Sequence, residues 1–142
     1  MSAEENKQRT LAFYEKVLNG HNVDLIDEFC AKDCVEHSPP PIPDLKQGVE
    51  GVKQMLGGWL QAFPDLKMNV VEVIAEGDRV SAVCEWSGTH KGSLMGERPT
   101  GKSVHGRMID FVRIENGMMT EHWGYGNDPE VLGSLGISPP AA

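Results

Sequence analysis

The spacing of apolar residues changes once along this chain, near residue 66, and this change limits the folds that the sequence can adopt. Between Gly48 and Phe63 apolar residues recur every three or four positions, which is the period of an amphipathic helix. Beyond residue 66 they alternate with polar residues, as in LKMNVVEVIAE and RVSAVCEWSGTH, which is the period of a strand. Helices followed by strands predict an α+β fold in which the helices cover one face of an antiparallel sheet.

The first half of the chain carries the signals of three helices. Ser2 and Glu5 have the spacing of a capping box, and the helix that they begin is predicted to end at Gly20. Asn22 is a suitable cap for a short second helix, after which DCVEHS has an extended pattern and leads into the Pro-rich loop PPPIP. The third helix is predicted over residues 48–63.

The second half is predicted to form four strands. Asn116-Gly117 predicts a hairpin between SVHGRMIDFVRI and MMTEHWGYG, because this dipeptide suits a two-residue turn. KGSLMGERPTGK is rich in Gly and Pro and is predicted to be a loop, which we expect to form a mobile lip of a pocket. Asp128-Pro129 predicts a final helical turn that ends near Gly133 or Gly136, and we expect the SPPAA tail to be mobile.

Length and charge exclude several classes of protein. The 142 residues suffice for one domain, 1–142, and 13 basic against 21 acidic residues give a net charge of −8, so a nucleic-acid partner would be repelled. No apolar stretch is long enough for a membrane span, and the charged start lacks the apolar core of a signal peptide. Cys30, Cys34 and Cys84 have no CxxC spacing and are expected to be reduced, packed thiols in a cytoplasmic protein.

Six fragments in one order carry a family resemblance: AFPDLK, AEGDRV, GTHKG, PTGK, DFVRIENG and EHWGYGN. Read together, they resemble the SnoaL-like polyketide cyclases, also described as ester cyclases, of the NTF2-like superfamily. The resemblance implies an NTF2-like cone in which a curved sheet packs on three N-terminal helices around a deep apolar cavity. It also implies a homodimer formed through the outer face of the sheet. Known relatives close rings of polyketide esters by aldol chemistry, and similarly folded limonene epoxide hydrolases open epoxides with water.

Asp110 is the first candidate for a catalytic residue. The inner face of its predicted strand is otherwise uncharged, because alternation places on it Val104, Gly106, Met108, Asp110, Val112 and Ile114. A carboxylate that faces an apolar cavity loses hydration, which favours its neutral form and suits a general acid or base. The resembled families place a polar catalytic side chain near this position, a histidine in the cyclases and an aspartate in the epoxide hydrolases. The alternative is an aspartate paired with an arginine or lying at a cavity rim.

His122, on the last predicted strand, is the candidate partner of Asp110, and the turn decides whether the two meet. A two-residue Asn116-Gly117 loop would set Asp110 opposite Trp123 and turn His122 to the other face. A three-residue loop that also includes Glu115 would set Asp110 opposite His122. In contact, the two side chains would form a proton-transfer pair, whereas a lone strand histidine is more often a packing residue.

His37 and a set of large apolar residues complete the candidate site. His37, in VEHSPPP, is placed near the cavity mouth by the resemblance and could bind a substrate carbonyl or act as base, or it could hold the loop by a backbone hydrogen bond. Asp33, Glu36 and Glu85 are further carboxylates, which we expect to be solvated. The residues predicted to line a substrate, unless they only pack the core, include Met55, Trp59, Trp86, Met108 and Trp123.

Two departures from the resembled cyclases bear on function. Their catalytic aspartate, two residues after the histidine of the last strand, corresponds here to Gly124, and a further acidic position corresponds to Asn127. The chain also lacks GxGxxG, P-loop, HExxH and GxSxG motifs, and its five histidines are not at metal-ligand spacing. The sequence therefore predicts a cofactor-free and metal-free enzyme that acts on a small, largely apolar carbonyl, ester or epoxide. The alternative is a noncatalytic ligand-binding or accessory module.

Overall fold

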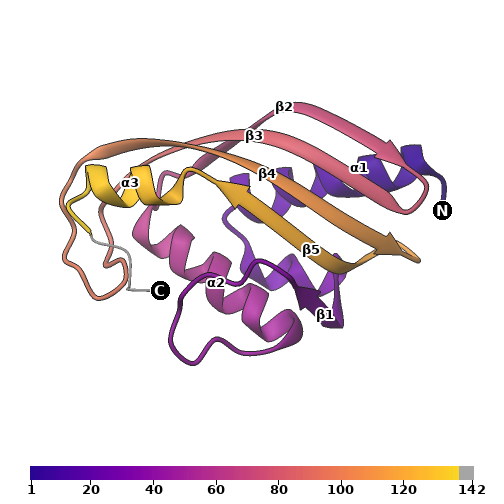
Figure 1. The fold of residues 1–142 in the computed structure, drawn as a ribbon, viewed down its shortest axis with the longest axis horizontal. Helices are drawn as coiled ribbons and strands as arrows, with labels where there is room; N and C mark the ends of the chain where they lie inside the picture. The colour runs from indigo at the N-terminus through magenta and orange to yellow at the C-terminus, as the bar shows by residue number, and fades with distance from the viewer. Residues whose placement is uncertain (138–142) are drawn as a thin grey trace.

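The computed structural model describes residues 1–137 and confirms the α+β class (Figure 1). Its helices lie against one face of a curved, open sheet. The predicted mobile tail lies outside the described residues. As the alternation predicted, the second half of the chain forms the strands β2 to β5 in sequence order.

The first predicted helix consists of two parts. The α-helix α1 (Ala3–Phe13) begins at the predicted capping box, in which Ser2 accepts a hydrogen bond from the backbone of Glu5. It continues as the π-helical segment η1 (Tyr14–Asn19), whose wider turn changes the direction of the side chains that follow. The short second helix is the 3-10 helix η2 (Val23–Glu28), capped by Asn22 as predicted.

The extended segment after η2 forms a strand that the sequence predicted only as extended chain. This strand, β1 (Cys30–Glu36), leads through the Pro-rich loop to α2 (Gly48–Ala62), the third predicted helix. β1 pairs with β5 in the parallel direction and forms one edge of the sheet. The sheet is therefore mixed, and its parallel edge differs from the fully antiparallel sheet that was expected.

The other four strands form an antiparallel sheet. They are β2 (Lys67–Glu76), β3 (Arg79–Thr89), β4 (Ser103–Glu115) and β5 (Met118–Gly126), and with β1 they give the order β1-β5-β4-β3-β2. Asn116 and Gly117 both have positive φ, as a type I′ turn requires, so the predicted hairpin is confirmed. The predicted final helix is α3 (Asp128–Ser134).

The main core lies between the helices and the inner face of the sheet. Tyr14 of η1, Phe63 after α2 and Trp86 of β3 are all buried in it. Gly106 of β4 lies directly under the indole of Trp86, because a Cβ at this position would stand 2.0 Å from the indole nitrogen. Large side chains thus occupy the space between the two layers.

The predicted loop between β3 and β4 is anchored at its base. The backbones of His90 and Lys102 are hydrogen bonded, and the buried His90 ring contacts Thr100.

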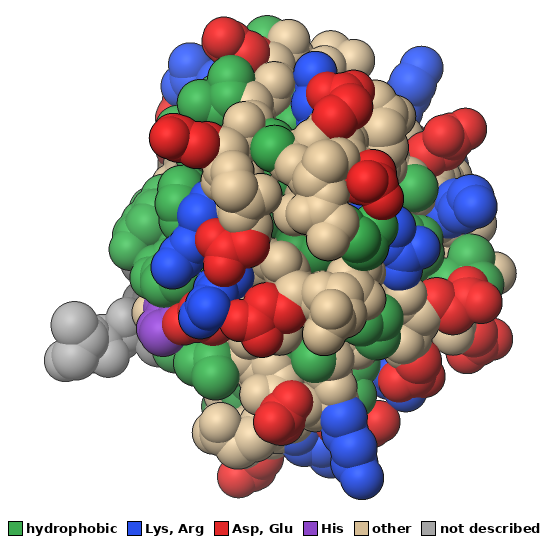
Figure 2. Space-filling model, turned by 90° about the vertical axis from the view of Figure 1, so that its right-hand side faces the viewer, with side chains coloured by type: hydrophobic (Ala, Val, Ile, Leu, Met, Phe, Trp, Pro, Cys, Tyr) green, Lys and Arg blue, Asp and Glu red, His purple; other side chains and the backbone are tan. Residues whose placement is uncertain are grey.

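Across the part of the chain that the structure describes, the helices are too short or too polar to cross a membrane. Figure 2 shows one end of the molecule, where acidic and basic side chains are interspersed and no large basic patch is seen.

Candidate functional site

Asp110 lies on the inner face of β4, as the alternation of that strand predicted. The residue is 6% exposed, and both of its carboxylate oxygens have protein partners. Oδ2 accepts a hydrogen bond from the hydroxyl of Tyr14 at 2.6 Å, and Oδ1 lies 2.7 Å from Nε2 of His122. The acid is therefore held from two sides and is not isolated in an apolar wall.

Tyr14 comes from the first residue of the π-helical segment η1. Burial raises the pKa of its hydroxyl well above the ordinary value, and the nearby Asp110 carboxylate raises it further. The hydroxyl therefore stays protonated and can only donate to Asp110. Tyr14 was not among the predicted site residues, and the signal that could have indicated it is a hydroxyl among the apolar residues of the first predicted helix.

A β-bulge in β5 brings His122 to the inner face. The turn has two residues, so Glu115 pairs with Met118 and Ile114 with Met119, but Thr120 has no partner and the next pair is Arg113 with Glu121. The extra residue reverses the face of every residue that follows it. Neither predicted register is therefore observed, since Asp110 is opposite Gly124 and His122 is opposite Val112.

His122 nevertheless contacts Asp110, because the two residues are diagonal neighbours on the same face. Its other ring nitrogen, Nδ1, lies 2.5 Å from Oε2 of Glu36. Burial by itself lowers the pKa of the imidazole, but hydrogen bonds to Asp110 and Glu36 outweigh it and raise the pKa of His122 to about 10. At neutral pH the ring is an imidazolium that donates one hydrogen bond to each carboxylate.

Glu36 ends β1 and faces inward, where the sequence analysis had expected a solvated carboxylate. Its side chain is 18% exposed, and its second oxygen accepts a hydrogen bond from the backbone of Ser38. Alternation with the buried Cys34 could have indicated the inward direction, but the parallel pairing with β5 could not be foreseen. Glu36, His122, Asp110 and Tyr14 thus form one continuous chain of hydrogen bonds.

A pocket of about 100 Å³ lies beside Glu36, between the Pro-rich loop and α2, and Met55 is among its lining residues. This volume is below the roughly 300–1,000 Å³ of sites for drug-sized ligands. The deep central cavity implied by the resemblance remains a prediction.

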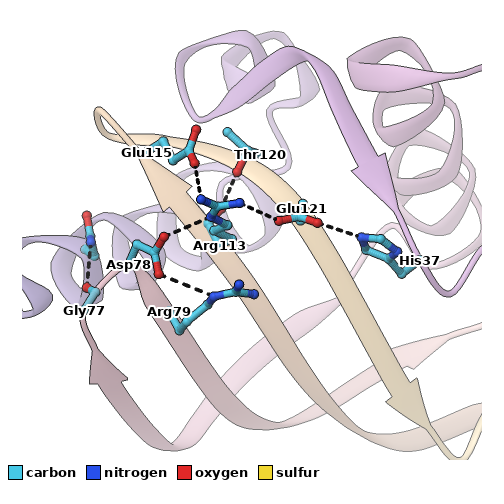
Figure 3. A network of polar contacts seen from close by, with 9 residues as sticks. His37, Gly77, Asp78, Arg79, Arg113, Glu115, Thr120 and Glu121 are labelled. Carbon is cyan, nitrogen blue, oxygen red and sulfur yellow. Dashed lines mark hydrogen bonds and ion pairs between the residues drawn. The ribbon is translucent and has the colours of Figure 1, made fainter.

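The structure does not bring His37 to the Asp110–His122 pair. Its ring lies on the outer face of the sheet, stacked on Trp123 at 4.2 Å between centroids, and its Nε2 lies 3.0 Å from Glu121. Figure 3 shows that Glu121 also forms an ion pair with Arg113, which in turn pairs with Asp78 and Glu115. The bulge that turns His122 inward turns Trp123 outward.

The other predicted lining residues lie on the inner side. Trp59 of α2 and Trp86 of β3 pack edge to face at 5.2 Å, and both contact Phe63. Met108 is half-buried on the inner face of β4, two residues before Asp110. Trp59, Trp86 and Met108 are thus core residues on the same side of the sheet as Asp110.

The two departures from the resembled cyclases have different structural explanations. Gly124 lies directly opposite Asp110, and a Cβ there would stand 3.4 Å from Oδ1 of Asp110 and 2.8 Å from Cε1 of His122. Glycine at this position therefore allows the His122 ring to lie against the backbone of β5 next to the acid. Asn127 instead joins β4 to α3, because its side chain accepts a hydrogen bond from the backbone of Arg107 and donates one to Glu130.

This arrangement is suited to acid–base chemistry. It places an aspartate next to a charged imidazole in a largely dry environment. A carboxylate in this position can take a proton from carbon or water, and the neighbouring positive charge can stabilise negative charge that develops on a substrate oxygen.

The sequence matches a known family over most of its length: residues 8–133 match the SnoaL-like polyketide cyclases. No match is found among curated proteins.

Solved structures give the same result. AclR of Streptomyces galilaeus, a proposed hydroxylase, is 30% identical with a TM-score of 0.82 over 99% of this chain and 91% of that chain. IdmH of Streptomyces antibioticus, a proposed polyketide cyclase, is 27% identical with a TM-score of 0.78 over 93% of this chain and 99% of that chain. A proposed SnoaL-like polyketide cyclase of a Jannaschia species, 19% identical with a TM-score of 0.83 over 98% of this chain and 95% of that chain, supports the fold alone.

Proposed function

Because this chain belongs to the SnoaL-like polyketide cyclase family, we propose that it is a cofactor-free acid–base enzyme of the cyclase type. Its substrate is a small, largely apolar carbonyl, ester or epoxide. The observation that carries the proposal is the buried contact between Asp110 and the charged His122, which the glycine at position 124 makes room for.

In this proposal Asp110 acts as the general base. For a carbonyl or ester, it takes a proton from the carbon next to the carbonyl group, and the electron pair moves toward the carbonyl oxygen. His122 supplies the nearby positive charge that favours this oxyanion. For an epoxide, Asp110 instead takes a proton from water as the water oxygen attacks a ring carbon; the ring C–O bond at that carbon breaks, and the alkoxide that forms takes a proton back from Asp110. Met55, Trp59, Trp86 and Met108 are proposed to contact the apolar part of the substrate.

The register explains how this chain can keep an acid without an aspartate at position 124. Asp110 and Gly124 are opposite each other on β4 and β5, so side chains from the two positions reach the same space. The resembled cyclases have a histidine near the first position and an aspartate at the second. Here the aspartate comes from β4, while the imidazole comes from β5, where the cyclases also have a histidine; this supports an acid–imidazole pair whose acid lies on the opposite strand.

Replacing Asp110 by Asn tests this proposal. We expect wild-type protein in D₂O to exchange the α-hydrogens of apolar ketones and esters, or to hydrate apolar epoxides, as followed by NMR. Asp110→Asn should reduce the rate about 10²- to 10⁴-fold, the usual contribution of a general base. Asp33→Asn, at an exposed position of β1, is the matched control and should keep the wild-type rate.

Equal rates in wild-type protein and Asp110→Asn would refute the role of Asp110. A wild-type protein that catalyses none of these reactions, yet carries an apolar molecule in native mass spectrometry, would favour the noncatalytic ligand-binding module.

We also propose that the protein is a cytoplasmic homodimer. Its three cysteines are free and buried, which fits a reducing compartment. The outer face of the sheet exposes large apolar side chains on three strands, among them Val83, Ile109, Phe111 and Tyr125. A second copy of the chain, placed on this face, would cover them.

A further inference from the structure

Glu36 is the carboxylate at the solvent-facing end of the chain of hydrogen bonds. It is opposite His122 in the parallel pairing of β1 and β5, so its side chain projects from the same face. The backbone N–H of Ser38 holds one of its oxygens at 3.1 Å, which leaves the other oxygen directed at Nδ1 of His122. Glu36 also borders the pocket between the Pro-rich loop and α2.

We propose that Glu36 is a positioning residue, which fixes the ring of His122 so that its Nε2–H points at Asp110 and keeps that ring charged. The inference rests on the proposed function of the Asp110–His122 pair and assigns Glu36 a part in it. Glu36 acts through His122 and does not itself react with substrate.

The geometry of the ring supports this role. An imidazole bonded only at Nε2 can turn about that hydrogen bond and can lose the proton at Nδ1. A carboxylate at each nitrogen prevents both changes, since turning the ring breaks two charge-assisted hydrogen bonds. Burial opposes the positive charge, so the second carboxylate is needed to keep the proton on a ring that is mostly removed from water.

The groups around this triad come from every element packed against it. Asp110 of β4 faces His122, with Tyr14 of η1 and Cys84 of β3 next to Asp110. Around Glu36 lie Cys34 of the same strand and Lys46, which lines the pocket. In both thiols burial raises the pKa, to about 11 for Cys84, so neither adds a negative charge near neutral pH.

The outer face of the same two strands offers a matched control. There His37, the residue directly after β1, contacts Glu121 of β5, so the histidine and the glutamate have exchanged places relative to the inner pair. Both pairs link the edge strand β1 to β5. Replacing Glu121 by Gln therefore removes one charge and one link between the strands. Glu121 is next to His122 in sequence but lies on the face away from Asp110.

The experiment compares Glu36→Gln with Glu121→Gln by NMR titration of the ring nitrogens of His122. In wild-type protein the ring should keep both protons until the pH approaches about 10. In Glu36→Gln the titration should move down by about 1–3 pH units, the usual effect of removing one close opposite charge. In Glu121→Gln it should stay at the wild-type value. An unchanged titration in Glu36→Gln, or an equal change in Glu121→Gln, would overturn the inference.

Glu36→Asp distinguishes the effect of the negative charge from the effect of the contact with His122, and it replaces Glu36→Gln in the experiment if that variant does not fold. The shorter side chain keeps the charge but cannot hold the same contact, so the titration should stay nearer to wild type while the exchange of substrate α-hydrogens slows at least tenfold. A wild-type α-hydrogen exchange rate in Glu36→Asp would contradict the positioning role. If wild-type protein proves inactive, the proposed function fails, but the titration still decides whether Glu36 controls His122.

Discussion

The imidazole of His122 lies between two carboxylates, and its proton couples folding to pH. In the unfolded chain this histidine has the ordinary pKa of 6.5, whereas in the folded protein its pKa is about 10. A group whose pKa is raised by folding contributes stability that is fully present below pH 6.5 and is lost as the pH rises toward 10. The contribution is on the order of a few kcal/mol.

We therefore predict that the free energy of unfolding of the wild-type protein falls between pH 6.5 and pH 9, measured by urea denaturation at several pH values. Burial also raises the pKa of the three cysteine thiols, but their effect begins only above the ordinary thiol value of 9.0. This window therefore isolates His122. In His122→Gln the free energy of unfolding should be nearly constant over it, and a slope equal to that of wild-type protein would show that the histidine is not charged in the fold.

At the scale of elements, the bulge at Thr120 determines which side chains of β5 face the core. The sequence predicts the Asn116-Gly117 turn, because both positions need positive φ and these residues adopt it readily. A bulge has no comparable signal, since the extra residue needs no special side chain. Both of the registers considered were therefore wrong, although the contact between Asp110 and His122, which the sequence left open, is present in the structure.

In other elements too, the features that depend on neighbouring residues were predictable, whereas the contacts between distant segments were not. The capping box at Ser2, the strand alternation that turns Asp110 inward and the start of α3 at Asp128-Pro129 depend on neighbouring residues and were predictable. The contacts of Glu36 and Tyr14 depend on the parallel pairing of β1 and on the π-helical turn of η1. Both are set by packing between segments far apart in sequence, so two of the four residues in the hydrogen-bonded chain could not be assigned from the sequence.

Deleting Thr120 tests the role of the bulge. Without Thr120, Glu121 follows Met119 directly and the observed pairs remain, with Asp110 opposite Gly124 and His122 opposite Val112. His122 therefore stays on the inner face, and we expect its pKa to remain at about 10, as measured by NMR. Thr120→Ala keeps the residue count and should keep the wild-type pKa of His122. A pKa of His122 near the ordinary 6.5 in the deletion variant would mean that β5 has slipped to another register and that the extra residue is needed to hold His122 inward.

At the scale of the whole molecule, the outer face of the sheet carries rows of exposed apolar side chains, which a monomer would leave in contact with water. The strand register aligns Val83, Ile109 and Tyr125 in one row across β3, β4 and β5, and Phe111 and Trp123 in the next row. Ile109 and Tyr125 are 48% and 68% exposed. Adjacent apolar rows on a sheet face, with the stacked His37 beside Trp123, form a continuous surface that water solvates poorly.

If this surface joins two copies of the chain around a two-fold axis, any change on it occurs twice in the same interface. Ile109→Lys would then bury two unpaired charges, each of which costs about 3–5 kcal/mol, so the dimer should dissociate at least 10²-fold more readily. Light scattering after size-exclusion chromatography should show the mass of one chain for Ile109→Lys and of two chains for wild-type protein. His105→Lys adds a charge to the same face of β4, outside the apolar rows, and should remain dimeric. A wild-type protein with the mass of one chain at micromolar concentration would rule out this dimer, and His37 and Trp123 would then be exposed at the surface of the active protein.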